Sequence, residues 1–305
     1  MIFLEERIRN FLERFFNPET KPVQSLLFYG EETVGKKTTA LAFAKALLCQ
    51  AEQKTWNGCG HCQNCLRFDK GLHPDFLLLE PVDNDIPIET VRKAIEFLHY
   101  EPQFSFLRIL IINEADRLKE DVQNTLLKTL EEPPQNTLII FLTAYPQKLL
   151  ATVFSRLLPI RFHRSSVEQI TNFLMEKQSL NKNQAQEIAK MSEGKIGLAL
   201  RMLDKEYLKK IEDTQKQLTQ ILKSDFLDQL QYLQALADDK EGLLEVLKIW
   251  LETLNRDIQT SFLPSRIKLT KELLKAFHLI SNYNINSSLL LENIFLNYKF
   301  DQALK

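Results

Sequence analysis

Apolar runs of strand length alternate with helical patterns over about residues 1–163 of the chain. Such alternation predicts a parallel sheet that is covered by helices on both faces. The predicted strands are Ser25–Tyr29, Asp75–Glu80, Arg108–Ile112, Thr137–Thr143 and Leu157–Phe162, and the predicted helices include Lys36–Leu48, Ile88–His99 and Lys119–Leu130.

From Ser165 onward the pattern becomes wholly helical. Ser165 and Glu168 have the spacing of a capping box at the start of the first helix, and Asn181 is expected to cap the next. After about residue 204 only one glycine remains, and the apolar spacing predicts about five amphipathic helices, including Gly242–Phe262 and Leu269–Ile280.

These patterns divide the chain into three domains. An α/β domain is expected over residues 1–163, a small helical domain over 164–205, and an all-helical domain over 206–305. With 305 residues, of which 44% are hydrophobic and 26% charged, the chain is long and apolar enough to fold into several domains.

The net charge bears on nucleic-acid binding, and the lack of a recognisable export signal bears on localisation. Lys and Arg number 39 and Asp and Glu number 40, so the net charge is −1 and a broad basic DNA-binding face is not expected. Any DNA contact would be local or shared with partner proteins. No run of about 18 apolar residues is present, and the N-terminus lacks the pattern of a secretory signal. We therefore expect a cytoplasmic protein with no membrane contact.

The four cysteines, Cys49, Cys59, Cys62 and Cys65, lie close together in the sequence. Two consecutive spacings of two residues bring three thiolates onto one tight turn, and the fourth comes from the end of the preceding helix. This arrangement predicts a structural zinc site, which four thiolates would close to substrate. Disulfides, a redox pair and free thiols are the alternatives, and the absence of an export signal disfavours disulfides.

The first predicted strand leads into a glycine-bounded loop, Gly30 to Gly35, followed by Lys36. This is nearly the phosphate-binding pattern in which loop amides and a helix N-terminus hold phosphates and the lysine reaches the terminal ones. Lys37 occupies the position of the hydroxyl that binds magnesium, and Thr38 lies about 100° further around the helix. The sequence therefore predicts an impaired nucleotide loop, with a merely structural turn as the alternative.

A second nucleotide-binding pattern follows the third predicted strand. A strand that ends in Asp-Glu supplies a carboxylate for magnesium and a glutamate that orients the attacking water. Here Asn113 replaces the aspartate, whereas Glu114 remains and Asp116 follows closely. A neutral amide weakens metal binding further. The alternative is a solvated acidic turn.

Together these patterns resemble the clamp-loader subunits of the AAA+ class, in particular those of bacterial DNA polymerase III. The resemblance covers about residues 24–200, and the order and spacing of its motifs make it specific. Besides the cysteine cluster, the matching stretches are Asn113–Asp116, Leu126–Pro134, Thr143–Lys148, Leu149–Arg156 and Glu193–Leu200. The helical remainder is similar to the family in length and helicity, where it forms a collar that joins subunits.

The resemblance also implies residue roles. Arg156 lies in the element that offers an arginine finger to the ATP of a neighbouring subunit, and the family's cysteine after it is Leu157 here. A helix-end arginine bound to local carboxylates is the alternative. Thr143 lies near the first sensor position, and Gly197 takes the place of the second sensor arginine. The implied nucleotide-binding residues are Gly30, Gly35, Lys36, Thr38, Asn113, Glu114 and Thr143.

Three altered catalytic positions, Lys37, Asn113 and Gly197, favour a non-hydrolysing member of the delta prime type over an ATP-hydrolysing motor subunit of the gamma/tau type. ATP or ADP would bind weakly or not at all. The resemblance implies the motor subunits and the delta subunit as partners, the sliding clamp as an indirect one, and primed DNA within the complex. A zinc protein that itself grips nucleic acid is the remaining alternative, which the few basic residues near the cysteines disfavour.

Overall fold

The computed structural model describes residues 5–17, 23–82, 85–260, 264–283 and 285–303. The chain forms two compact units, Met1–Leu200 and Arg201–Lys305. Each unit has its own hydrophobic core, and the two are described separately below.

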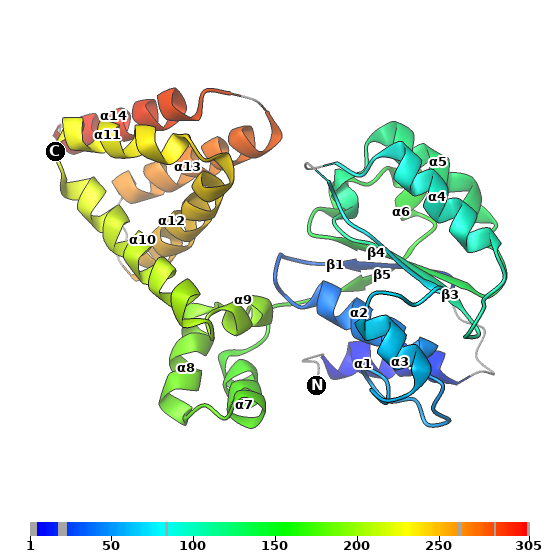
Figure 1. The fold of residues 1–305 in the computed structure, drawn as a ribbon. Coiled ribbons are helices and arrows are strands. Elements are labelled where there is room, and N and C mark those ends of the chain that lie inside the picture. Colours follow the sequence, from blue (N-terminus) through cyan, green and yellow to red (C-terminus); the bar gives the residue numbers. More distant parts are fainter. Residues whose placement is uncertain (1–4, 18–22, 83–84, 261–263, 284, 304–305) are drawn as a thin grey trace. The chain divides into compact units, whose positions relative to one another are not determined.

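The N-terminal unit contains a parallel β-sheet flanked by helices (Figure 1). The sheet has five strands in the order β2-β3-β4-β1-β5. Three strands have the predicted bounds, and the other two lie within their predicted ranges. The strands are β1 (Ser25–Tyr29), β2 (Phe76–Leu79), β3 (Arg108–Ile112), β4 (Thr137–Thr143) and β5 (Leu158–Arg161).

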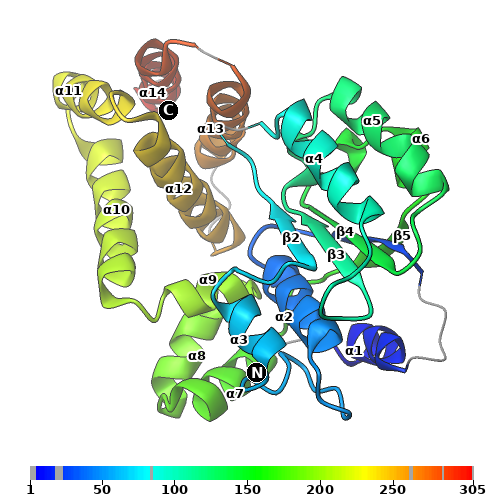
Figure 2. The ribbon, with the colours of Figure 1, turned by 45° about the vertical axis from the view of Figure 1, so that its right-hand side comes forward.

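Helices cover both faces of the sheet, as the alternating pattern predicts (Figure 2). Neighbouring residues of one strand enter different cores: Leu26 and Phe28 pack on the face of α2, whereas Leu27 packs on the face of α4 and α5. One face carries α4 (Ile88–His99), α5 (Glu120–Glu131) and α6 (Ala151–Phe154), and the other carries α1 (Glu6–Glu13), α2 (Lys36–Leu48) and α3 (Gln63–Asp69). Short 3-10 turns lie at Arg14–Phe16, Ala115–Arg117 and Pro146–Lys148.

Three helices follow the sheet: α7 (Val167–Gln178), α8 (Lys182–Met191) and α9 (Ile196–Arg201). Asn181 caps α8 as predicted, because its side-chain oxygen accepts a hydrogen bond from the amide of Gln184. The predicted capping box is wrong by one residue. Ser166 is the N-cap of α7 and pairs reciprocally with Gln169, while the amide of Ser165 donates to the Gly194 carbonyl at 2.8 Å.

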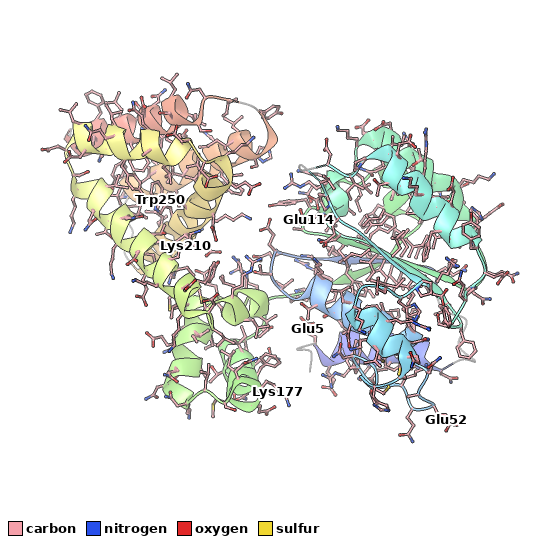
Figure 3. The ribbon with its side chains drawn as sticks, in the orientation of Figure 1. Glu5, Glu52, Glu114, Lys177, Lys210 and Trp250 are labelled. Atoms are coloured by element: carbon pink, nitrogen blue, oxygen red, sulfur yellow. The ribbon has the colours of Figure 1, made fainter. Side chains whose placement is uncertain are left out.

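The C-terminal unit is wholly helical in the part that the structure describes. Trp250 lies fully buried near the middle of its core (Figure 3). Its helices are α10 (Lys205–Lys223), α11 (Phe226–Ala237), α12 (Lys240–Thr260), α13 (Pro264–Asn282) and α14 (Ser287–Ala303). The predicted helix end at Phe262 lies outside the described residues.

In the described ranges, none of the helices combines the length and the apolar character that crossing a membrane requires.

Candidate functional sites

The glycine-bounded loop connects β1 to α2 and has the backbone of a phosphate-binding loop. Gly35 is the N-cap of α2 with φ 98°, so the amides of the first helical turn face the loop. Gly30 has φ 147°, and a Cβ atom there would lie 2.3 Å from the carbonyl oxygen of Phe162. Both positions therefore need glycine: Gly35 for its backbone angle, and Gly30 for its angle and its close approach to Phe162, directly after β5.

Lys36 extends across this loop and binds its carbonyls. Its Nζ atom donates to the carbonyl oxygens of Gly30 at 2.6 Å and Glu31 at 2.5 Å. Burial lowers the pKa of Lys36 to about 8, although the nearby carboxylates of Glu32 and Asp116 raise it. The lysine predicted to bind phosphate thus lies at the loop, where two loop carbonyls accept hydrogen bonds from its ammonium group.

The two positions that the nucleotide-binding patterns assign to magnesium ligands carry hydrogen-bond donors instead. Lys37, in the first turn of α2, donates to Oε1 of Glu80 at 2.7 Å, and Asn113, after β3, donates to the same oxygen at 3.1 Å. Thr38 is exposed one residue further along the helix. Magnesium prefers several oxygen ligands in near-octahedral geometry, and an ammonium group repels it. These residues therefore do not fit a magnesium ion.

The acidic turn after β3 is held by side-chain contacts. Glu114, labelled in Figure 3, has φ 49° and lies 3.6 Å from Nε of Arg117. The hydroxyl of Thr143, at the end of β4, donates to Asp116 at 2.5 Å and accepts from the amide of Tyr145 at 2.9 Å. Both hydrogen-bonding functions of the Thr143 hydroxyl are thus used within the protein.

Helix α9 packs directly on the loop at Gly197, the residue expected in place of the second sensor arginine. The amide of Gly197 donates to the carbonyl oxygen of Thr33 at 2.7 Å, and a Cβ atom on Gly197 would lie only 2.8 Å from that oxygen. A second link joins the loop to the helical segment, because Arg164 contacts both carboxylate oxygens of Glu31 at 2.9 and 2.6 Å. This contact with Arg164 lowers the pKa of Glu31 despite its partial burial.

Arg156 follows α6 and lies at the surface, far in sequence from the loop. Its guanidinium donates to the carbonyl of Thr152 at 2.7 Å and to Glu131 of α5 at 2.5 Å. The side chains of Arg156 and Glu131 are 33% and 52% exposed, so the pair is solvated and its release costs roughly 0–1 kcal/mol. The alternative to an arginine finger is an arginine bound to local carboxylates. That contact is present, and the arginine side chain remains partly exposed.

The four cysteine sulfurs form one cluster, with all of them within 4.8 Å of one another. The pairs Cys49–Cys62 and Cys59–Cys65 have Sγ–Sγ distances of 3.9 Å, so all four thiols are free and no disulfide links them. Tetrahedral zinc with bonds of about 2.3 Å separates its sulfur ligands by about 3.8 Å. The donor set and its spacing therefore fit a zinc ion.

Backbone amides point at three of the four cysteine sulfurs, whereas burial raises the pKa of the fourth thiol, Cys65, to about 12. The amides of Cys59, Cys62 and Cys65 donate to cysteine sulfurs at 3.3–3.4 Å. Burial raises the pKa of Cys62, but amide hydrogen bonds outweigh this effect and lower the pKa to about 6. Gly58 has φ 67°, and a Cβ atom there would lie 2.6 Å from Sγ of Cys65.

Comparison with protein families identifies the chain. The family model described as "DNA polymerase III, delta subunit" matches residues 5–166, more than half of the chain and most of the unit that carries these sites. The chain belongs to the DNA polymerase III delta subunit family. This membership confirms the clamp-loader resemblance drawn from the motifs.

Delta prime and tau subunits of bacterial DNA polymerase III are identical to this chain at about a third of the aligned residues. The delta prime subunit of Bacillus subtilis is 32% identical over 166 residues, and that of Pseudomonas aeruginosa is 33% identical over 132 residues. The tau subunit of Escherichia coli is 32% identical over 183 residues. The alignments cover 54%, 43% and 58% of this chain and 50%, 40% and 28% of those proteins, so they span half of the relatives' lengths or less.

Solved structures share the fold of this chain. A DNA polymerase III gamma subunit-related protein from Thermotoga maritima matches 96% of this chain and 97% of its own with a TM-score of 0.55 at 14% identity. A single-residue variant of RuvB from the same organism matches 98% of this chain and 88% of its own with a TM-score of 0.51 at 16% identity.

Sequence reasoning missed two acidic partners in these sites. Glu80 follows β2, and the carboxyl ends of neighbouring parallel strands meet at one edge of a sheet, so its proximity to Asn113 could have been inferred from the strand order. Glu131, the partner of Arg156, ends α5 and has no comparable signal, because the contact depends on the packing of α5 against α6.

Proposed function

We propose that the chain is a non-hydrolysing clamp-loader subunit of DNA polymerase III, of the delta prime type. The observation that supports this most strongly is the Glu80 carboxylate bridging Lys37 and Asn113, because both groups that should hold the catalytic magnesium are donors bound to a protein carboxylate. Gly197 adds to it, since the contact with Thr33 leaves no space for a sensor side chain.

In this proposal Arg156 acts on a neighbouring subunit. Its guanidinium would leave the solvated contact with Glu131 and approach the phosphates of ATP bound to a gamma/tau-type motor subunit. There it would stabilise charge on the transferring phosphoryl group, an effect worth ~10³–10⁵ in rate for arginine fingers. The delta subunit would be a second partner, and the complex would load the sliding clamp onto primed DNA, with the helices of residues 206–305 as the collar.

We further propose that Cys49, Cys59, Cys62 and Cys65 hold a structural zinc ion. The ion would tie the end of α2 to the start of α3, where Cys62 is the N-cap. It would have no catalytic role, because four thiolates complete a tetrahedral shell.

ATP hydrolysis by the motor subunits tests the role of Arg156. The motor, delta and clamp proteins are assembled on primed DNA with the wild-type chain, with Arg156→Ala or with Arg92→Ala. Arg92 is the matched control, because it is an exposed arginine on α4 that pairs with Glu89 at 2.7 Å. We expect the chain alone to be inactive, the wild type and Arg92→Ala to stimulate hydrolysis equally, and Arg156→Ala to lose at least about tenfold of that stimulation while still assembling.

An ATP-hydrolysing subunit of the gamma/tau type is the second candidate, since the tau subunit of Escherichia coli matches this chain at nearly the same identity as the delta prime subunits. Hydrolysis by the chain alone, together with unchanged stimulation in the Arg156→Ala complex, would favour that candidate and contradict the role of Arg156 in trans.

A further inference from the structure

Three elements of the N-terminal unit meet at one carboxylate oxygen beside the phosphate loop. Oε1 of Glu80, directly after β2, accepts from Nζ of Lys37 at 2.7 Å and from Nδ2 of Asn113 at 3.1 Å. The Lys37 and Glu80 side chains are 44% and 46% exposed, so water and small ligands reach this contact. The lysine ammonium is thus fixed at the first turn of α2 by a partner on a neighbouring strand end.

This contact lies where nucleotide-binding proteins of this fold hold their metal. A magnesium ion there is coordinated by a hydroxyl in the first turn of the helix and by a carboxylate at the end of a strand. Lys37 and Asn113 occupy those two positions and point their donors at the same oxygen. The ammonium group is itself a cation, and it is covalently attached at the place of the ion.

The part of the loop that contacts phosphate is intact. Gly30 and Gly35 keep the backbone angles that the turn needs, and α2, a helix of 13 residues, begins at the loop with its free amides. The Lys36 ammonium group donates to two loop carbonyls, and a bound phosphate would attract it away from them. The site therefore offers two lysine ammonium groups and a row of amides to a polyphosphate.

We propose that Lys37 replaces the magnesium ion of this loop, so that the loop binds ADP and ATP in their metal-free forms. The proposal deepens the proposed function, on which it rests, by specifying the state of the nucleotide that a non-hydrolysing subunit takes. Glu80 is a positioning residue, because it holds the ammonium group near the strand edge without contacting the nucleotide. Metal-free nucleotide carries more negative charge than its magnesium complex, so its electrostatic attraction to the two ammonium groups is stronger.

Calorimetric titration of the full, zinc-loaded chain with ADP, in magnesium chloride or in magnesium-free buffer without a chelator, tests this proposal. We expect the wild-type affinity without magnesium to equal or exceed that in magnesium, within about threefold. The variant Lys37→Thr is expected to bind at least about tenfold more weakly without magnesium, because it loses a charged contact to phosphate. Adding Asn113→Asp to it restores the hydroxyl and the carboxylate, and binding should then be at least about tenfold tighter with magnesium than without it.

Lys119→Thr is the matched control, because Lys119 is an exposed lysine paired with Asp85 at 2.6 Å outside the loop. It should leave both affinities unchanged. Wild-type binding that requires magnesium would overturn the proposal, and so would the absence of binding in both buffers. Either result is independent of Arg156, whose role is measured by hydrolysis in the assembled complex, so failure of one proposal is distinguished from failure of the other.

Discussion

The buried carboxylate of Asp75 offers a quantitative test of how the loop before β3 is held. Asp75 is fully buried directly before β2, and its oxygens accept from the amides of Gln103 at 2.7 Å, Phe104 at 2.8 Å and Ser105 at 3.1 Å. The hydroxyl of Ser105 donates to it at 2.8 Å. A carboxylate is the one side chain of this size that accepts all four bonds.

Replacement by asparagine keeps the shape and removes an acceptor. In Asp75→Asn an NH₂ group on a fully buried side chain faces at least one backbone N–H, which costs about 1–3 kcal/mol, and the remaining bonds lose their charge assistance. We therefore expect the free energy of unfolding of the N-terminal unit to fall by about 3 kcal/mol.

The effect should depend on pH. Burial raises the pKa of Asp75, but the amides of Gln103 and Phe104 and the Ser105 hydroxyl outweigh it and hold the pKa below its ordinary value. The charge therefore stabilises the fold above the unfolded-state pKa of about 4, and this contribution is lost as the pH falls through the lower folded-state value. The difference between wild type and Asp75→Asn should shrink below about pH 4.

Urea unfolding followed by tryptophan fluorescence measures this difference. The chain has 2 tryptophans, Trp56 in the N-terminal unit and Trp250 in the C-terminal unit, so a Trp250→Phe background reports the N-terminal unit alone. Asp85→Asn is the control, because this exposed carboxylate pairs with Lys119 and should change stability by less than about 0.5 kcal/mol. An Asp75→Asn effect no larger than the control's, or one that stays constant from neutral to acid pH, would refute the reasoning.

Two further changes address the metal and the helix that packs on the loop. Cys62→Ser should lower the bound zinc measured by elemental analysis from one ion per chain towards none and reduce the thermal midpoint; full zinc occupancy in the variant would contradict the four-cysteine site. Gly197→Arg should not create ATPase activity and should destabilise the N-terminal unit by about 1–3 kcal/mol, because its side chain collides with the Thr33 carbonyl. An unchanged thermal midpoint in this variant would contradict the prediction, because it would show that α9 can move away from the loop without loss of stability.

The strongest patterns in the sequence predicted the sheet well. The runs of β1, β3 and β4 are apolar on both faces, as buried parallel strands require, and their bounds were predicted to the residue. Helices α2 and α4 were also predicted with their observed ends, whereas α1 and α3 were not identified. Helix α3 has 7 residues and starts at a cysteine N-cap, so its sequence shows the metal spacing more clearly than a helical repeat.

The site could be predicted only as far as local motifs reach. The loop, the strand-end Asn113 and the cysteine spacing are continuous in sequence, and the structure brings each set together. Contacts between distant segments could not be read in this way. Ser165 illustrates the point, since its amide bonds to Gly194, and this tertiary contact moves the start of α7 by one residue.

Helix α2 has one end in each of the two chemical centres of the N-terminal unit. Lys36 and Lys37 begin it at the phosphate loop, and Cys49 follows its last residue at the metal cluster. Its 13 residues span about 20 Å, and most of its side chains are buried. Because α2 is buried and held at both ends, a shift along its axis or a rotation about it at one end moves the other end. Loss of the metal should therefore displace Lys36 and Lys37. Zinc content thus becomes a variable to control in any measurement on the loop.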